Sequence, residues 1–417
     1  MRNLLVTFYV CFSVILNSSA QTTLVSVHAI FRHGARAPVQ NVTSEEARSH
    51  FYRGLGQLTD EGIEQARVIG TLLRQRYVDS GFLDARMISS EVLFRSSPVE
   101  RCLMTIQTIG NTMFPNATPP VQTMPRNEDY LLLPKLDCPF LYDEYQKSFN
   151  LTEKEMVVAK KNIWDISERA LQRAAAQTTL LKNRARENIP ALMLEKKAGL
   201  AVPAWFDDEA YEEAEYVFFS ALSVMSSVGE YYSPEGIKPK SGYLLDTVMK
   251  NIKKSVKCHL ENKTNCGKKF QAFSSHDILI LSMLESFGIR EAALGKDRAP
   301  NFLATILIET YMINGQPFVK LIYRKDPKDP EYLILTGNVR NCPANKEFCE
   351  AERFTSCCDA FMTSDPQTQC YGVQNKWEMT PMSWILFAIA VIFLVLTIVL
   401  LFFVLRYRNR NSLNLKI

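Results

Sequence analysis

The sequence has few residues of the kind that bind transition metals. Only five histidines occur among 417 residues, and the ten cysteines form no Cys-x-x-Cys pair. Because structural zinc sites use four such ligands at paired spacings, a zinc cluster is not expected. The chain also has no internal repeat and no low-complexity tract, which excludes a solenoid. With 47% hydrophobic and 11% aromatic residues, it can bury a sizeable core.

The sequence also lacks a basic folded region. Its formal net charge is +4, but the basic residues at the two ends account for this excess. Residues 21–405 are therefore close to neutral, and we expect no nucleic-acid partner. The basic residues concerned are Arg2, Arg406, Arg408, Arg410 and Lys416.

Long apolar segments occur only at the ends of the chain. Residues 1–20 combine a basic start, an apolar stretch and small residues, which is the layout of a cleaved secretory signal. Residues 384–405 carry no charge and, at about 1.5 Å per residue, can cross the ~30 Å hydrocarbon layer. Basic residues in the tail, 406–417, place the tail in the cytoplasm. The sequence thus predicts a single-pass type I membrane protein whose larger part is luminal or extracellular.

A luminal location accounts for two further patterns. Asn-x-Ser/Thr sequences predict glycosylation at Asn41, Asn116, Asn150 and Asn262. The cysteines predict disulfides in an oxidising compartment, and residues 341–383 are expected to form a disulfide-rich stalk. Nine cysteines remain after the signal, so one thiol is left over, for which Cys102 is the candidate. The disulfide candidates are Cys138, Cys258, Cys266, Cys342, Cys349 and Cys370, and Cys258 is close enough to Cys266 to close a small loop.

The hydrophobic pattern predicts an α/β fold. Residues 24–31 form a near-continuous apolar run, typical of a central strand covered on both faces. Strands and helices alternate in residues 21–130 and 251–340, which predicts a mainly parallel sheet flanked by helices. Residues 131–250 are mostly helical, and we expect them to form an inserted cap over a pocket. Other expected strands lie near Val92–Phe94, Lys269–Phe273, Ala304–Met312 and Phe318–Tyr323, and expected helices start near Thr59, Pro98, Tyr211 and Asp277.

Polar clusters follow three of the expected strands. They are Arg32-His33-Gly34-Ala35-Arg36-Ala37-Pro38, Arg95-Ser96-Ser97-Pro98-Val99-Glu100-Arg101 and Ser275-His276-Asp277. Open α/β sheets bind ligands at the carboxyl ends of their strands, and helix N-termini attract anions. If the clusters converge, they form a pocket with guanidinium forks that suit a phosphate monoester. An imidazole can then be the nucleophile and a carboxyl group the acid, in a scheme that needs no metal or cofactor.

The first cluster resembles the Arg-His-Gly-x-Arg-x-Pro signature of the histidine acid phosphatases, whose fold is similar to phosphoglycerate mutase. The later segments, Gly54–Gly62, Arg95–Met104 and His276-Asp277, resemble further family segments in order and spacing. The layout resembles lysosomal acid phosphatase and related membrane-bound members. The resemblance implies that His33 attacks phosphorus and that Asp277 is the proton donor. It also implies that phosphate is bound by Arg32, Arg36, Arg101 and His276.

Some features depart from the family or stay open. Ala35 and Ser97-Pro98 stand where the lysosomal and prostatic enzymes carry other residues. Arg101 could instead pair with Glu100, and Asp277 could be only a helix N-cap. The alternatives to a general acid phosphatase are a narrower enzyme for inositol phosphates, lysophospholipid phosphates or nucleotides, and an inactive binding protein. The physiological substrate, a homodimer, and the choice among lysosome, endosome and cell surface are left open.

Overall fold

The computed structural model describes residues 22–134, 138–148, 163–184, 187–264, 266–329, 331–372 and 381–413. The expected signal segment and the glycosylation site at Asn150 lie outside these residues. The chain divides into two compact units, residues 1–371 and 372–417. The first unit contains the whole sheet, and the second contains one long helix.

The sheet of the first unit has the strand order β3-β2-β4-β1-β5-β6-β7, with β8 paired to β6. β1 is central, as its apolar run predicted. It pairs in parallel with β4 and antiparallel with β5. The strands are β1 (Thr22–Arg32), β2 (Val92–Ser96), β3 (Val121–Gln122), β4 (Phe270–Ser275), β5 (Thr305–Ile313), β6 (Gln316–Arg324), β7 (Leu333–Ile334) and β8 (Cys349–Glu350).

The sheet is mixed, which differs in part from the mainly parallel sheet expected. The pairs among β1, β2, β3 and β4 are parallel, whereas β5, β6, β7 and β8 pair antiparallel. Only Asn314 and Gly315 separate β5 from β6, and both have positive φ, at 50° and 79°. Such a two-residue turn joins antiparallel strands only. The parallel part is the one that carries the predicted polar clusters.

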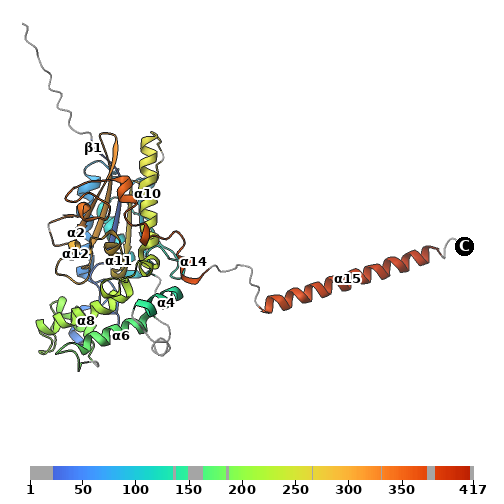
Figure 1. Cartoon of the computed structure of the whole chain (residues 1–417), viewed down its shortest axis with the longest axis horizontal. Helices are drawn as coiled ribbons and strands as arrows, with labels where there is room; N and C mark the ends of the chain where they lie inside the picture. Colours follow the sequence, from blue (N-terminus) through green and yellow to red (C-terminus); the bar gives the residue numbers. More distant parts are fainter. Residues whose placement is uncertain are drawn as a thin grey trace, which may run out of the picture. The chain divides into compact units, whose positions relative to one another are not determined.

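Helices cover both faces of the sheet (Figure 1). Ala29 and Phe31 of β1 point into the cluster that contains Ile69 of α2 (Asp60–Leu73) and Ile106 of α3 (Glu100–Met113). Ile30 points into the opposite cluster, formed with α10 (Tyr243–Leu260) and α11 (Asp277–Phe287). Side chains alternate across a strand, so an all-apolar strand must be buried on both sides. The shorter helices of this unit are α1 (Glu45–His50), α12 (Arg290–Leu294), α13 (Ala351–Thr355) and α14 (Pro366–Tyr371).

The helical insertion has small apolar clusters of its own. The α6 and α8 helices lie side by side (Figure 1) and contribute Ala174, Ala210 and Val217 to one cluster. By contrast, Val228, Ile237 and Leu244 belong to the cluster under the sheet, so the core resumes near residue 228, before the expected boundary at residue 250. The helices of the insertion are α4 (Pro139–Ser148), α6 (Ile163–Ala176), α7 (Ile189–Lys197), α8 (Asp208–Ser226) and α9 (Pro234–Ile237).

In its described part, up to residue 372, the cysteine-rich segment packs on the core instead of projecting as a stalk. Phe354 and Cys358 are fully buried in the same cluster as Phe287 of α11, because this stretch alternates cysteine with large apolar side chains that need cover. Cys102 is the buried free thiol among the described cysteines, as expected. The disulfides are Cys138–Cys370, Cys258–Cys266, Cys342–Cys349 and Cys357–Cys358, and the last joins neighbours in the sequence.

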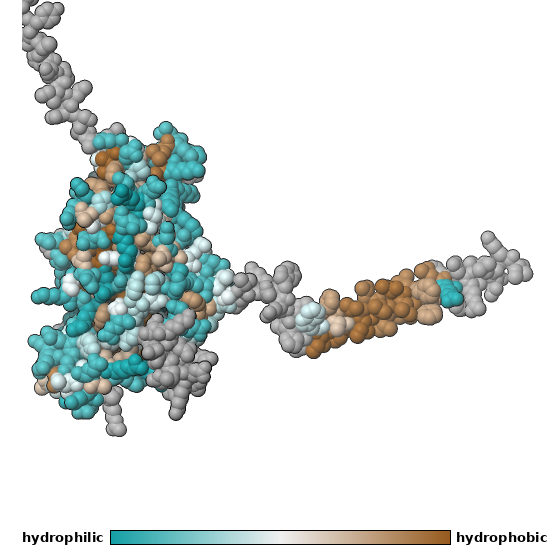
Figure 2. Space-filling model, in the orientation of Figure 1, coloured by the Kyte–Doolittle hydropathy of each residue, from teal (hydrophilic) through white to brown (hydrophobic). Residues whose placement is uncertain are grey.

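The second unit consists of α15 (Pro381–Leu413) in its described part. Residues 384–406 form 23 consecutive residues with a mean hydropathy of 3.4 over the best window. Figure 2 shows this helix as a continuous apolar surface. Its length and composition are sufficient to cross a bilayer, in agreement with the segment expected from the sequence.

Candidate active site

The three predicted clusters meet at the carboxyl ends of neighbouring parallel strands. Arg32 lies opposite Ser275 in the register of β1 and β4, and Ser96 lies opposite Ser274 in that of β2 and β4. The backbone N–H of His33 donates to Ser275 O at 3.0 Å, so the pairing continues one residue beyond β1. Residues 33 and 276 are thus neighbours, and their imidazole centroids lie 5.6 Å apart.

His33 is held in one tautomer by its own loop. Its side chain is buried, with 2% of the residue exposed, and Nδ1 lies 2.9 Å from the carbonyl oxygen of Gly34. A carbonyl can only accept, so Nδ1 carries the proton and Nε2 keeps its lone pair. Burial and the charges of Arg101 and Arg32 lower the pKa of His33 well below its usual value of 6.5. The imidazole is therefore neutral, which is the form that can attack an electrophile.

A close contact between two glycines fixes this loop. A Cβ on Gly34 would lie 2.6 Å from Gly62 O, and one on Gly62 would lie 2.2 Å from Ala35 O. Only residues without a side chain allow the loop to approach α2 so closely. Gly62 is also where the Thr59 hydroxyl accepts the backbone N–H that caps α2, as the sequence predicted. The start of α2 thus positions the loop that carries His33.

Side chains from α2 and α3 hold the same loop. The N–H of Gly34 donates to Thr105 Oγ1 at 3.1 Å, and that of Ala35 donates to Gln65 Oε1 at 2.9 Å. Both acceptors are buried. Sequence reasoning did not identify Thr105 or Gln65, because neither belongs to a polar cluster and only the packing of the two helices brings them to the loop.

Three arginines reach the site with donors to spare. The Nε atoms of Arg32, Arg36 and Arg101 are buried and have no hydrogen-bond partner among the described residues. Arg36 donates from Nη1 to its neighbour's carbonyl, Ala37 O, at 3.0 Å. The alternative in which Arg101 pairs with Glu100 is not observed, since Glu100 accepts instead from the side-chain amide of Gln57. The three guanidinium groups share a single carboxylate, Asp277, which pairs with Arg32 at 2.9 Å, and this excess of buried positive charge favours an anionic ligand.

His276 bridges two of the clusters. Arg101 Nη2 lies 3.5 Å from His276 Nδ1, and a guanidinium can only donate. The ring proton is therefore on Nε2, which donates to Ser97 Oγ at 3.0 Å. Burial, with Arg101 as the next cause, lowers the pKa of His276 to about 3. This neutral imidazole is held at the edge of the site by Ser97, whose role was not predicted.

Asp277 is the first residue of α11, and His276 occupies the N-cap position. Its Oδ2 accepts from Arg32 Nη2 at 2.9 Å, and its Oδ1 accepts the backbone N–H of Ile278 at 3.0 Å. Burial raises the pKa of Asp277, but the opposing charges of Arg32 and Arg36 outweigh it and the net shift is downward. Without a ligand the carboxylate is therefore ionised and paired with Arg32.

Arg95 has a structural role, although it belongs to the second cluster. Its Nη2 lies 2.8 Å from Asp129 Oδ1, with side chains 8% and 0% exposed. The pair is thus closed to a ligand, and Arg95 is not among the phosphate ligands that the resemblance implies. Asp129 also accepts the backbone N–H groups of Leu131 and Leu132, and so anchors the segment after β3.

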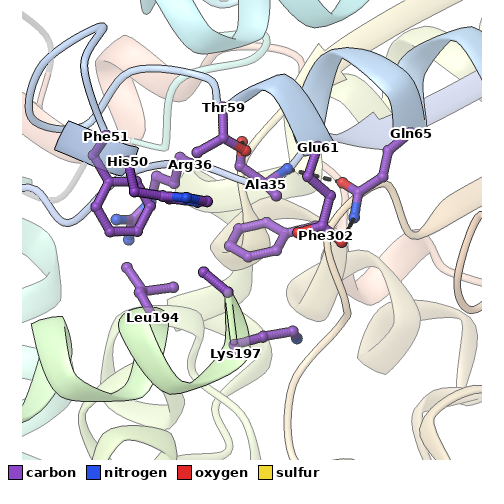
Figure 3. A pocket seen from close by; sticks show the side chains of 11 residues that line it. Ala35, Arg36, His50, Phe51, Thr59, Glu61, Gln65, Leu194, Lys197 and Phe302 are labelled. Carbon is purple, nitrogen blue, oxygen red and sulfur yellow. Dashed lines mark hydrogen bonds between the residues drawn. The ribbon is translucent and has the colours of Figure 1, made fainter. Parts of the chain in front are cut away.

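A pocket opens beside the loop that carries His33 (Figure 3). Arg36 and Phe302 line it from the core, and Leu194 and Lys197 line it from α7 of the helical insertion. The Phe302 ring also lies 4.4 Å from the guanidinium carbon of Arg32 and 5.8 Å from the His33 ring. Neither Phe302 nor Lys197 was predicted, because both lie outside the three clusters. The other lining residues are Ala35, His50, Phe51, Thr59, Glu61, Gln65 and Ala198.

A neutral buried imidazole among three arginines, at the carboxyl edge of an α/β sheet, fits an enzyme of the phosphoryl-transfer class. The comparisons agree with this class. Residues 23–324 match the model of the histidine phosphatase superfamily, branch 2. The chain belongs to this superfamily and, within it, to the histidine acid phosphatases.

Relatives of known sequence support the same activity. The chain is 56% identical to putative acid phosphatase 1 of Caenorhabditis elegans, over 99% of this chain and 98% of that protein. It is 26% identical to the prostatic acid phosphatase of Rattus norvegicus, over 88% and 94% of the two chains. It is 28% identical to the testicular acid phosphatase of Mus musculus, over 77% and 76%. The function is therefore hydrolysis of phosphate monoesters.

Solved structures share the fold. The apo phytase of Hafnia alvei superimposes with a TM-score of 0.54 at 13% identity, covering 83% of this chain and 98% of that chain. The phytase of Citrobacter braakii gives a TM-score of 0.55 at 12% identity, covering 83% and 99%. At these identities the similarity concerns the arrangement of the sheet and its helices, and the α/β fold expected from the sequence is confirmed.

Proposed function

We propose that this acid phosphatase works through a phosphohistidine on His33, with Asp277 as the proton donor and Arg32, Arg36, Arg101 and His276 as phosphate ligands. The observation that carries the proposal is the tautomer of His33. Its Nδ1 is occupied by the Gly34 carbonyl at 2.9 Å, which directs the free lone pair of Nε2 away from its own loop and leaves it available for attack.

In the first step, Nε2 of His33 bonds to phosphorus while the bond from phosphorus to the ester oxygen breaks. The leaving oxygen takes a proton from the carboxyl group of Asp277 and departs as an alcohol. Asp277 must be protonated for this step, although Arg32 and Arg36 lower its pKa in the free enzyme. A bound phosphate group neutralises the same arginines, so substrate binding weakens their effect and raises the pKa of Asp277 toward its usual range.

In the second step, the Asp277 carboxylate accepts a proton from water as the water oxygen attacks the phosphorus of phosphohistidine. The bond from phosphorus to Nε2 breaks, which releases orthophosphate and returns neutral His33. Throughout both steps the arginines stabilise the charge on the phosphoryl oxygens. Their free Nε donors are suited to this role because they are fixed before the ligand arrives.

We further propose that residues 1–20 are a cleaved signal and that residues 384–405 span a membrane, with the active site luminal or extracellular. The apolar helix over residues 384–406 supports this arrangement, as do the disulfides, which form in oxidising compartments. Three of the proposed glycosylation sites, Asn41, Asn116 and Asn262, are exposed on the first unit. Of residues 131–250, we propose that the part before the core resumes acts as the cap, since it has apolar clusters of its own and α7 lines the pocket.

The test is phosphate release and phosphoenzyme trapping with the His33→Ala variant of the full chain. We expect the wild-type enzyme to release phosphate from p-nitrophenyl phosphate and to give an acid-labile, base-stable phosphoenzyme on rapid quenching. The variant should give neither, while it still binds inorganic phosphate through the arginines. Residual burst kinetics in the variant would show that another residue is the nucleophile.

A further inference from the structure

Lys197 is a cation at the mouth of the pocket without a carboxylate partner. It is the last residue of α7, and among the residues that the structure describes no carboxylate oxygen lies within 4.0 Å of its Nζ. Its closest polar contact is the side-chain oxygen of Asn301, at 3.4 Å. The preceding residue differs, since Lys196 Nζ pairs with Asp208 Oδ1 at 3.0 Å. Two lysines on one helical turn therefore have different environments, and Lys197 is the one without a carboxylate in direct contact.

The neighbours of Lys197 hold its ammonium group toward the site. Asn301 donates its side-chain amide to Asp297 Oδ2 at 3.1 Å, so its oxygen faces Lys197. The Phe302 ring lies near two cations, with Lys197 Nζ 5.4 Å and the Arg32 guanidinium carbon 4.4 Å from its centroid. The two charges can therefore be no further apart than these two distances combined. Figure 3 shows the lysine projecting from its helix beneath the Phe302 ring.

The charge around this lysine is predominantly positive on the side of the phosphate site. Burial and the like charge of Arg32 lower the pKa of Lys197, and the more distant carboxylates of Asp326, Glu215 and Asp297 only partly offset this. The acidic residue that lines the pocket, Glu61, has Lys328 Nζ at 3.2 Å. Apolar side chains such as Leu194 form the wall between. A negative charge on a ligand in this pocket would be attracted by Lys197 without having to displace a resident carboxylate.

We propose that Lys197 is a specificity-determining residue that selects phosphate monoesters whose alcohol part carries a second negative charge. The inference rests on the proposed function, because the ester phosphate must be bound by Arg32 and its neighbours. The apolar body of the alcohol then lies along Phe302 and Leu194, and its anionic group lies against the lysine. The helical insertion thus contributes directly to the choice of substrate.

The test compares two esters that differ in charge and hardly in size, meta-carboxyphenyl phosphate and meta-carbamoylphenyl phosphate. The readout is the ratio of their kcat/KM values at about pH 6, above the usual pKa of a carboxyl group. For the full-length wild-type enzyme we expect the ratio to favour the carboxylate. In Lys197→Gln the ratio should fall about three- to fivefold, as is typical for loss of one partly exposed ion pair. Lys197→Arg should retain the wild-type ratio, because it retains the charge.

Lys196→Gln is the matched control, since it removes the same charge from the same turn at a position that already pairs with Asp208. Its ratio should equal that of the wild-type enzyme. An unchanged ratio in Lys197→Gln, or an equal fall in both variants, would overturn the inference. In either case, phosphate release from both esters would still support the phosphatase assignment. No release from either ester by the wild-type enzyme would overturn the proposed function and the inference with it.

Discussion

Replacing Asp277 by asparagine separates the acid role of this residue from its structural role. The variant loses the proton but keeps an oxygen that can accept from Arg32 Nη2, which lies 2.9 Å from Oδ2 in the wild-type enzyme. The amide nitrogen then takes the place of Oδ1, which accepts the backbone N–H of Ile278 at 3.0 Å, and an amide nitrogen cannot accept. This one hydrogen bond at the start of α11 is lost, at a cost of roughly 1 kcal/mol, which is small beside the burial of α11. The fold and the binding of phosphate should therefore survive the substitution.

The expected loss depends on the leaving group. A positioned general acid contributes about 10²- to 10⁴-fold, or roughly 3–5 kcal/mol of transition-state stabilisation, where the leaving oxygen needs a proton. Asp277→Asn should therefore lower kcat/KM by this amount for an alkyl phosphate. For p-nitrophenyl phosphate, whose leaving group departs unprotonated, the loss should be less than about tenfold. Replacing the carboxylate by a neutral amide also makes the site more positive. This change affects all esters alike, so it does not alter the comparison between leaving groups.

The assay is kcat/KM across alkyl, phenyl and p-nitrophenyl phosphates, because this parameter includes only the steps up to formation of the phosphoenzyme. The slope of log kcat/KM against the pKa of the leaving group should be steeper in the variant than in the wild-type enzyme. Parallel slopes, with one uniform loss for every ester, would refute the acid role of Asp277. They would indicate instead that its carboxylate only orients Arg32.

Three further outcomes follow from the same structure. Asp129→Ala should lower the free energy of unfolding by about 3–5 kcal/mol in urea denaturation, because it leaves Arg95 buried without its partner; a loss below about 1 kcal/mol would contradict the pairing. As the pH is lowered, kcat/KM should show no decline near 6.5 from protonation of His33, since burial and nearby arginines lower its pKa well below that value. A decline of kcat/KM with an apparent pKa near 6.5 would count against this. Gly62→Ala should cost about 1–3 kcal/mol of stability and reduce turnover, because its Cβ would lie 2.2 Å from Ala35 O; wild-type melting and activity would show that the contact is relaxed in solution.

Local patterns were sufficient to predict much of the fold. The apolar run of β1 became the central strand, and the Thr59 cap became the start of α2. The antiparallel part of the sheet was not predicted. The short turn between β5 and β6 makes these strands antiparallel, but it indicates a hairpin only once the bounds of both strands are known. The stalk expected at residues 341–383 packs on the core in its described part, since contacts distant in sequence cover its apolar side chains.

The sequence by itself determined which chemical groups are available, because the strand-end motifs place arginine, imidazole and carboxylate at fixed positions along the chain. Only the tertiary structure decided which of them are free to act. Arg95 is neutralised by Asp129, whereas Arg101 keeps an unpaired donor. The same holds for Lys197, which approaches the pocket only through the packing of the insertion. The physical reason is that charge compensation and tautomer choice depend on neighbours within a few ångströms, and folding brings these neighbours from distant parts of the chain.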